Sequence, residues 1–162
     1  SAFWGGIAAA YLSKKYNIFF DEDLVISEDI AFFMKILMVT CADGMPEALT
    51  YYRRHIGSAT TRQWNPRTWE GTVILFDKVY PWVTKYYPEF EREFQMMIDY
   101  RTYRFILSVI KNGRYDESAE YIKRWGGRLI RFIHGDGKLN DRIKCWMILK
   151  KNINLIKVIK HV

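Results

Sequence analysis

Two acidic residues stand where a proton acceptor could be held rigidly. Glu28 and Asp29 follow Ser27 and precede a strongly apolar stretch, a pattern typical of the first turn of a helix with Ser27 as its N-cap. The helix dipole favours carboxylates at this place and keeps them ionised. An ionised carboxylate on a rigid backbone can take a proton from a neighbouring hydroxyl group. The same residues also make an ordinary helix start, and the local sequence alone favours that simpler interpretation.

A second segment carries cations that could face a negatively charged ligand. Arg53, Arg54 and His55 are followed at a short distance by Ser58. Charge that develops on a diphosphate leaving group is stabilised by Arg and Lys side chains or by a metal ion. The alternative is that the arginines lie on a solvent-facing edge strand and that His55 is a solvated loop histidine, since a single histidine is not a metal site.

Most of the chain is expected to be helical. Apolar residues recur at helical spacing from Ile30 to Cys41, so the helix that begins after Ser27 is predicted to end at Asp43-Gly44. Residues 48–53, which include the β-forming residues Thr50, Tyr51 and Tyr52, are predicted to form a strand. Helices are also predicted over 6–16 and over 66–87, the second capped by Asn65 and bent or broken near Pro81. A further helix is predicted to begin at Pro88 and to run until Asn112-Gly113. Another is predicted to be capped by Asp116, to run to His134 and to be weakened or kinked at Gly126-Gly127, and a basic helix that Asn140 caps follows it.

The front third of the chain resembles a known pattern over roughly Phe3 to Arg62. The segments that carry it are Phe3-Trp4-Gly5 through Lys14, Ile18-Phe19-Phe20-Asp21-Glu22-Asp23-Leu24, Ile26-Ser27-Glu28-Asp29-Ile30-Ala31-Phe32 and the stretch from Leu49 to Thr60. In this order they resemble the second half of the GT-A catalytic domain of family 2 glycosyltransferases. The resemblance is closest to the bacterial enzymes that build capsular, lipopolysaccharide and wall polysaccharides.

The resemblance implies a role for each candidate residue. Asp29 matches the general base of an inverting sugar transfer, and Glu28 matches a neighbour that orients the acceptor or the loop. Arg53, Arg54 and Ser58 match the segment that folds over the diphosphate of the nucleotide-sugar donor. His55 matches a histidine that helps to hold the divalent metal, Mg²⁺ or Mn²⁺, in some relatives. The acceptor is then a saccharide or a lipid-linked saccharide.

In that family a β/α nucleotide-binding half with a DxD acid pair comes before these motifs. Residues 21–23 have the DxD letters but lie in the acceptor lead-in, so they are interpreted as a turn. The opening Ser1-Ala2, without an initiator Met, suggests a chain cut from a longer protein. We therefore expect residues 1–162 alone to be inactive, and the missing half of the domain to be a partner of this one.

Charge divides the 162 residues into an acidic front and a basic back. Residues 1–60 hold five basic and seven acidic side chains, and residues 61–162 hold twenty and eleven.

Aromatics make up 17% of the chain, and those after Trp64 favour a helical core over a sugar-stacking groove or a membrane-facing surface. The basic end, rich in lysine with no acid after Asp141, suits an anionic membrane surface or an ordinary end helix. Nucleic acid is disfavoured, because the cations are mixed with acids and no nucleic-acid motif is present.

These features predict a mainly α chain: the acceptor half of a GT-A α/β fold with one or two short strands, followed by a bundle of about four helices. The predicted domains are residues 1–62 and residues 63–162. The alternative function is a non-catalytic helical interaction module or a membrane-surface-binding module. No apolar run reaches the roughly 18 residues of a membrane span, so a cytoplasmic place is expected, with peripheral attachment at the inner face of the cell membrane left open.

Overall fold

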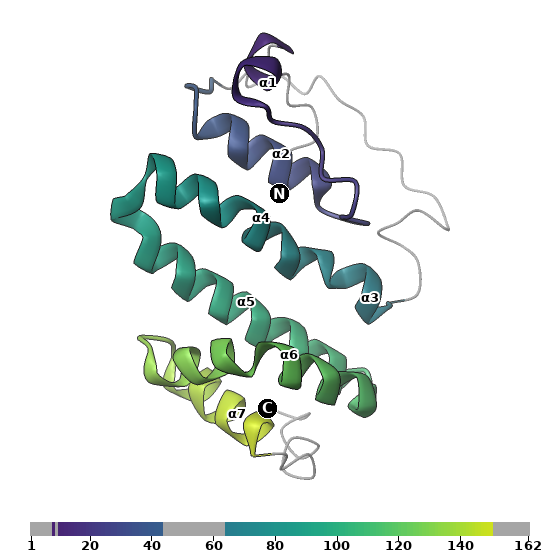
Figure 1. The fold of residues 1–162 in the computed structure, drawn as a ribbon. Coiled ribbons are helices and arrows are strands. Elements are labelled where there is room, and N and C mark those ends of the chain that lie inside the picture. The colour runs from purple at the N-terminus through teal and green to yellow at the C-terminus, as the bar shows by residue number, and fades with distance from the viewer. Residues whose placement is uncertain (1–7, 9, 44–63, 151–162) are drawn as a thin grey trace. The chain divides into compact units, whose positions relative to one another are not determined.

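Helices make up most of the chain that the structure describes. The structure is a computed structural model that describes residue 8, residues 10–43 and residues 64–150 (Figure 1). No strand occurs among these residues, so the expectation of a mainly α chain is confirmed for them; the strand predicted over 48–53 lies outside them. In chain order the elements are α1 (Ala10–Tyr16), α2 (Glu28–Leu37), α3 (Pro66–Trp69), α4 (Gly71–Tyr86), the 3₁₀ helix η1 (Pro88–Phe90), α5 (Glu91–Lys111), α6 (Tyr115–His134) and α7 (Leu139–Leu149).

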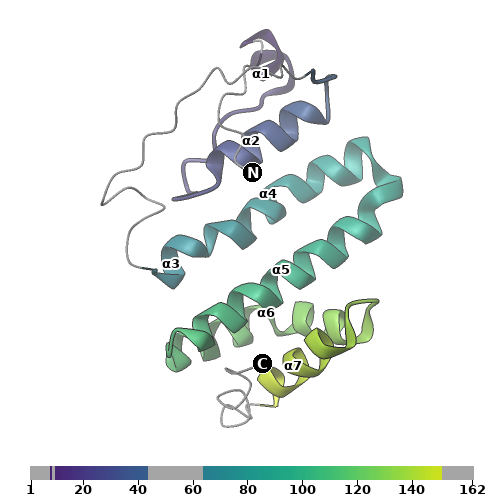
Figure 2. The same cartoon turned by 180° about the vertical axis from the view of Figure 1, so that it is seen from behind.

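The chain divides into two compact units, a first unit within residues 1–91 and a second unit within residues 92–162. In the first unit α4 packs along α2, which Figure 2 shows from behind. Buried side chains of α1, of the loop after it and of α2 form a shared core, with Trp82 of α4 packed against it; these are Leu12, Ile18, Phe32 and Ile36. The predicted boundary between residues 62 and 63 lies outside the described residues and stays a prediction.

The start of α2 differs from the expected N-cap. Ser27 has a left-handed backbone (φ 68°, ψ 16°), and its side chain accepts no hydrogen bond from the helix. A capping residue normally has an extended backbone, which brings its side-chain oxygen over the first N–H groups. Asp29 takes over part of this role, because its Oδ1 accepts a hydrogen bond of 2.8 Å from the N–H of Ile30. The prediction that Ser27 caps the helix through its side chain is wrong.

The end of α2 also differs, since the helix stops at Leu37 and not at Asp43. The N–H of Val39 donates to the carbonyl oxygen of Ile36, which tightens the last turn. Val39 packs on the core of the first unit, whereas residues 40–43 are exposed. The apolar spacing that reaches Cys41 therefore has no surface to bury against, and burial rather than spacing sets the helix end.

The predicted helix over 66–87 is observed as α3 and α4. Asn65 caps α3 as expected, with its Oδ1 accepting a 2.9 Å hydrogen bond from the N–H of Arg67. α4 continues through Pro81 without a break, and Pro81 is exposed. Gly71 opens α4 at a place of close approach, where a Cβ atom would lie 2.9 Å from the carbonyl oxygen of Ile26. Glycine therefore lets α4 approach the loop that leads into α2.

The second unit contains α5, α6 and α7, and α7 packs against α6. α5 ends before Asn112-Gly113 as predicted, and Gly113 has the positive φ of 77° typical of a helix C-terminus. α6 begins at Tyr115, not after an Asp116 cap. The carbonyl of Arg114 already accepts from Ser118, so the turn after α5 continues directly into α6. The kink that the two glycines predicted is confirmed, because Trp125, directly before them, has non-helical angles (φ −119°, ψ 18°).

α7 starts one residue before the expected cap. Lys138 occupies the cap position, and its carbonyl oxygen accepts from the N–H groups of Asp141 and Arg142, each at 3.0 Å. Asn140 is therefore inside the helix, and the prediction that it caps α7 is wrong.

Aromatic side chains build much of the core of the second unit, as the sequence favoured. The ring of Tyr103 stacks on Phe132 with centroids 5.0 Å apart. Phe105 meets Tyr121 edge to face at 4.9 Å, and Tyr121 stacks on Trp125 at 5.6 Å. All five side chains are buried. Because α5 contributes Tyr103 and Phe105 and α6 the other three, these rings tie the two helices together.

Candidate functional site

Asp29 lies in the first turn of α2 and is half-buried. Its Oδ1 accepts from the N–H of Ile30, while Oδ2 makes no hydrogen bond to any residue that the structure describes. One oxygen is therefore oriented by the backbone, and the other is the group that can accept a proton. Glu28 precedes it, also half-buried. The structure thus places both predicted catalytic acids at the start of one helix.

Packing behind α2 keeps this helix start in place. Ala31 and Phe32, which follow the two acids, are buried. The ring of Phe32 stacks on Phe20 of the preceding loop, with centroids 4.4 Å apart and an interplanar angle of 7°. Such a stacked pair contributes about 0.5–1.5 kcal/mol beyond its buried area. Loop and helix are therefore joined a single turn away from Asp29.

The other predicted site residues lie in a part of the chain that the structure does not describe. These are Arg53, Arg54, His55 and Ser58. Their approach to Asp29, and a shared concave surface between Asp29 and His55, stay predictions.

The acidic turn at residues 21–23 forms ion pairs with two lysines. Asp21 Oδ2 accepts from Lys35 Nζ of α2 at 2.7 Å. Asp23 Oδ2 lies 2.7 Å from Lys78 Nζ of α4, and the same Nζ is 3.9 Å from Asp21 Oδ1. The interpretation of these acids as a turn is confirmed, because residues 22 and 23 form one. These four side chains form the Asp21–Lys78 network. The network ties the lead-in loop, which is residues 17–27 between α1 and α2, to both α2 and α4.

These acids do not fit a metal site. Both carboxylates in the DxD spacing already face ammonium groups, and a cation would compete with them. Among residue 8 and the ranges 10–43 and 64–150, no group of three His, Cys, Asp or Glu side chains is placed to hold a metal ion.

Sequence reasoning missed both lysines of the network. Lys35 is 7% exposed and lies three residues after the buried Phe32, on the apolar face of α2. A lysine at such a position requires an acidic partner, because an unpaired buried ammonium group is costly. That requirement, together with the acidic turn, was the available signal for the Lys35 pair. Lys78 carries no comparable signal, since it is partly exposed on a helix far along the chain.

The pair of Lys78 and Asp23 predicts a specific pH dependence. The hydrogen bond from Lys78 lowers the pKa of Asp23 below 3.8, and the same bond raises the pKa of Lys78 above 10.5. The pair therefore stabilises the fold fully between these two values, and its contribution is lost as pH falls or rises beyond them. Both groups are solvated, so we expect Lys78→Met to lower the free energy of unfolding by less than about 1 kcal/mol at neutral pH.

Urea denaturation at several pH values measures this effect. The difference between the unaltered chain and Lys78→Met should shrink as the pH falls below 3.8 and as it rises above 10.5. Lys14→Met, which removes an exposed lysine of α1, is the matched control and should show no such profile. A difference that is independent of pH would contradict the pairing.

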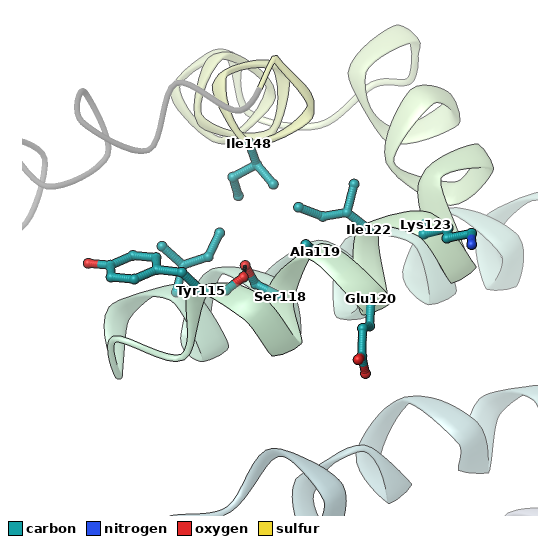
Figure 3. A pocket seen from close by; sticks show the side chains of 8 residues that line it. Tyr115, Ser118, Ala119, Glu120, Ile122, Lys123 and Ile148 are labelled. Carbon is teal, nitrogen blue, oxygen red and sulfur yellow. Dashed lines mark hydrogen bonds between the residues drawn. The ribbon is translucent and has the colours of Figure 1, made fainter.

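A pocket of about 490 Å³ opens in the second unit (Figure 3). Its described lining residues are Ile110, Tyr115, Ser118, Ala119, Glu120, Ile122, Lys123 and Ile148. Figure 3 shows Ile148 of α7 pointing toward α6 and Glu120 pointing away from Ile148. The Ser118 hydroxyl is already used, since it donates to the carbonyl oxygen of Tyr115 at 2.6 Å. The pocket has the size of a ligand site, but neither Glu28 nor Asp29, the two predicted site residues that the structure describes, lines it.

The buried polar groups of the second unit have structural partners. Asp99 is 3% exposed and accepts two hydrogen bonds from Arg131, at 2.9 and 2.8 Å. The Tyr103 hydroxyl donates to Asp141 at 3.1 Å, and burial raises its pKa. Burial also raises the pKa of the Cys145 thiol to about 12, so this cysteine stays protonated and is a poor nucleophile. These groups stabilise the packing of α5, α6 and α7 and offer no reactive centre.

Comparison with protein families, with curated proteins and with solved structures finds no match for this chain. Among the described residues no helix has the length and apolar character that a membrane crossing requires. The site is therefore defined by its own geometry: Glu28 and Asp29 at the start of α2, on a helix held by the core of the first unit and by the Asp21–Lys78 network.

Proposed function

We propose that this chain is the acceptor-side part of an inverting glycosyltransferase of the family 2, GT-A type. It would move a sugar from a nucleotide-sugar donor to a saccharide or lipid-linked acceptor in cell-surface polysaccharide synthesis. The observation that carries the proposal is the carboxylate of Asp29: it stands at a rigid helix start with one oxygen oriented by the backbone, inside the segment whose sequence resembles the acceptor motif of that family.

The chemistry assigned to this chain is the removal of one proton. The acceptor hydroxyl attacks the anomeric carbon of the donor, the bond from that carbon to the diphosphate breaks, and Asp29 takes the hydroxyl proton. Such a base contributes about 10²–10⁴-fold to the rate. Glu28 would orient the acceptor, and Arg53, Arg54 and Ser58 would face the leaving diphosphate. The family's Mg²⁺ or Mn²⁺ would neutralise that diphosphate, with His55 as the residue of this chain assigned to it.

The proposal requires a nucleotide-binding half, because the family places its β/α unit and DxD pair before these motifs. In this chain the DxD letters occur only at Asp21 and Asp23, and both are engaged by lysines. Purified residues 1–162, incubated with uridine and guanosine diphosphate sugars and Mg²⁺ or Mn²⁺, should therefore transfer no sugar. Transfer by this chain alone would contradict the requirement for a second half.

The reading frame that precedes Ser1 gives the sharper test. We expect it to encode alternating strands and helices with a DxD pair, and the longer product to turn over a nucleotide sugar. A preceding sequence without these features would overturn the assignment to this family and would favour the alternative, a non-catalytic helical interaction module.

A further inference from the structure

α7 exposes an apolar stripe that no described residue of the second unit covers. Leu139, Ile143 and Trp146 are 67%, 48% and 48% exposed. They follow one another at spacings of four and three residues, so they lie on one face of the helix. On the opposite face Cys145 and Ile148 are buried. α7 thus uses one side to pack on its own unit and presents a second apolar side to the surroundings.

Cations flank this stripe. Lys138 and Lys150 are exposed at the two ends of α7, and Arg142 is half-buried between them. Asp141, the one acid of α7, accepts from the hydroxyl of Tyr103 and is half-buried. The second unit as a whole carries sixteen basic and seven acidic side chains, a net charge of +9. The stripe is therefore flanked by cations and belongs to a unit whose sequence carries a net positive charge.

We propose that the exposed face of α7 binds an anionic lipid surface, with Leu139, Ile143 and Trp146 inserted at the interface and Lys138 and Lys150 at the headgroups. The inference does not rest on the proposed transferase function. Tryptophan is favoured at the boundary between hydrocarbon and headgroups. Lysine stems extend along apolar surface while their ammonium groups reach the lipid phosphates. An amphipathic helix with these features binds membranes in the plane of the interface.

A second copy of the chain fits the same face less well. In a two-fold contact the same surface meets itself, so the lysines at the ends of α7 would lie near those of the other copy. An anionic surface neutralises these charges instead, at about 1 kcal/mol for each lysine near the headgroups. Charge complementarity therefore favours lipid over self-association.

Vesicle sedimentation tests the proposal with the chain 1–162. We expect binding to equimolar phosphatidylglycerol and phosphatidylcholine vesicles, and little binding to phosphatidylcholine alone. Ile143→Ser with Trp146→Ser should lower the partition coefficient at least about tenfold by removing inserted apolar surface. Lys138→Glu with Lys150→Glu should lower it by a similar factor or more, since each reversal turns an attraction into a repulsion. Raising NaCl from about 0.1 M to about 1 M should weaken binding, because the Debye length falls from about 10 Å to about 3 Å.

Matched variants in the first unit distinguish binding by this face of α7 from non-specific binding of the chain to vesicles. Val25→Ser with Phe90→Ser removes two exposed apolar side chains, and Lys14→Glu with Lys15→Glu reverses two exposed charges of α1. Both should change the partition coefficient less than about twofold. Circular dichroism of every variant checks that the helices persist.

Three results would overturn the proposal. One is an absence of binding by the unaltered chain to the anionic vesicles. Another is an equal loss of binding in the α7 variants and in the first-unit variants. The third is a dimer in analytical ultracentrifugation that the Ile143 and Trp146 variant abolishes, because the face would then belong to a second copy.

Discussion

Replacing Asp29 by asparagine is expected to lower the turnover number by about 10²–10⁴-fold, in protein that carries both this chain and the nucleotide-binding half. The carboxylate is the group proposed to take the acceptor proton, and an amide cannot do so. Asparagine keeps an Oδ1 that accepts from the N–H of Ile30, so the helix start should persist. Because binding contacts remain, the loss should fall on kcat, with KM changed only a few-fold.

Controls for this prediction separate catalysis from helix structure. If Asp29 only stabilises the start of α2, Asp29→Asn should leave turnover within a few-fold, and Asp29→Ala should cost about 1 kcal/mol of stability. Glu28→Gln, a neighbouring change of the same kind, should lower turnover less than Asp29→Asn. Steady-state kinetics and urea denaturation of the three variants measure both properties. Near-normal turnover of the Asp29→Asn protein would refute the role of a general base.

The second large effect concerns stability. Asp21→Ala is expected to lower the free energy of unfolding by about 2–3 kcal/mol, somewhat less than the cost of breaking a fully buried pair. The side chain of Lys35 is 9% exposed and that of Asp21 is 18% exposed, so removal of the carboxylate leaves a nearly buried ammonium group without its partner. Lys78 does not compensate, because it is a cation too.

The reverse change should cost less. Lys35→Met removes the charge and keeps an unbranched side chain in the same apolar surroundings, and the carboxylate of Asp21 retains Lys78 at 3.9 Å. Replacing one partner by an apolar side chain of similar volume is tolerated better than leaving a charge alone. Urea denaturation of both variants, read at neutral pH, measures the difference. Equal costs for Asp21→Ala and Lys35→Met would show that the ammonium group is solvated, and would contradict its burial.

The same comparison bears on the candidate site. The Asp21–Lys78 network and the stacked ring of Phe20 both join the lead-in loop to α2, one helix turn or two from Asp29. A variant that loosens the loop should therefore also reduce the precision with which the carboxylate is held. For this reason the kinetics of Asp21→Ala belong beside those of the Asp29 variants.

Features that depend on a few neighbouring residues could be predicted from the sequence. The Asn65-Pro66 cap, the end of α5 before Gly113 and the kink before Gly126 are all observed. The acidic turn over residues 21–23 is observed too. Each of these signals acts through a local hydrogen bond, a backbone preference or a missing side chain, so the sequence within a few positions contains the whole cause.

Features that depend on burial could not be predicted in the same way. The sequence predicted a helix end at Asp43 and no partner for Lys35, and both were decided by packing against residues elsewhere in the chain. The candidate acids Glu28 and Asp29 could be predicted from the sequence, but the packing and ion pairs that hold α2 in place could not. The sequence by itself determined the helical character and the acids at the start of α2. Only the tertiary structure decided which faces are buried and which charges meet, because both depend on side chains that lie far apart along the chain.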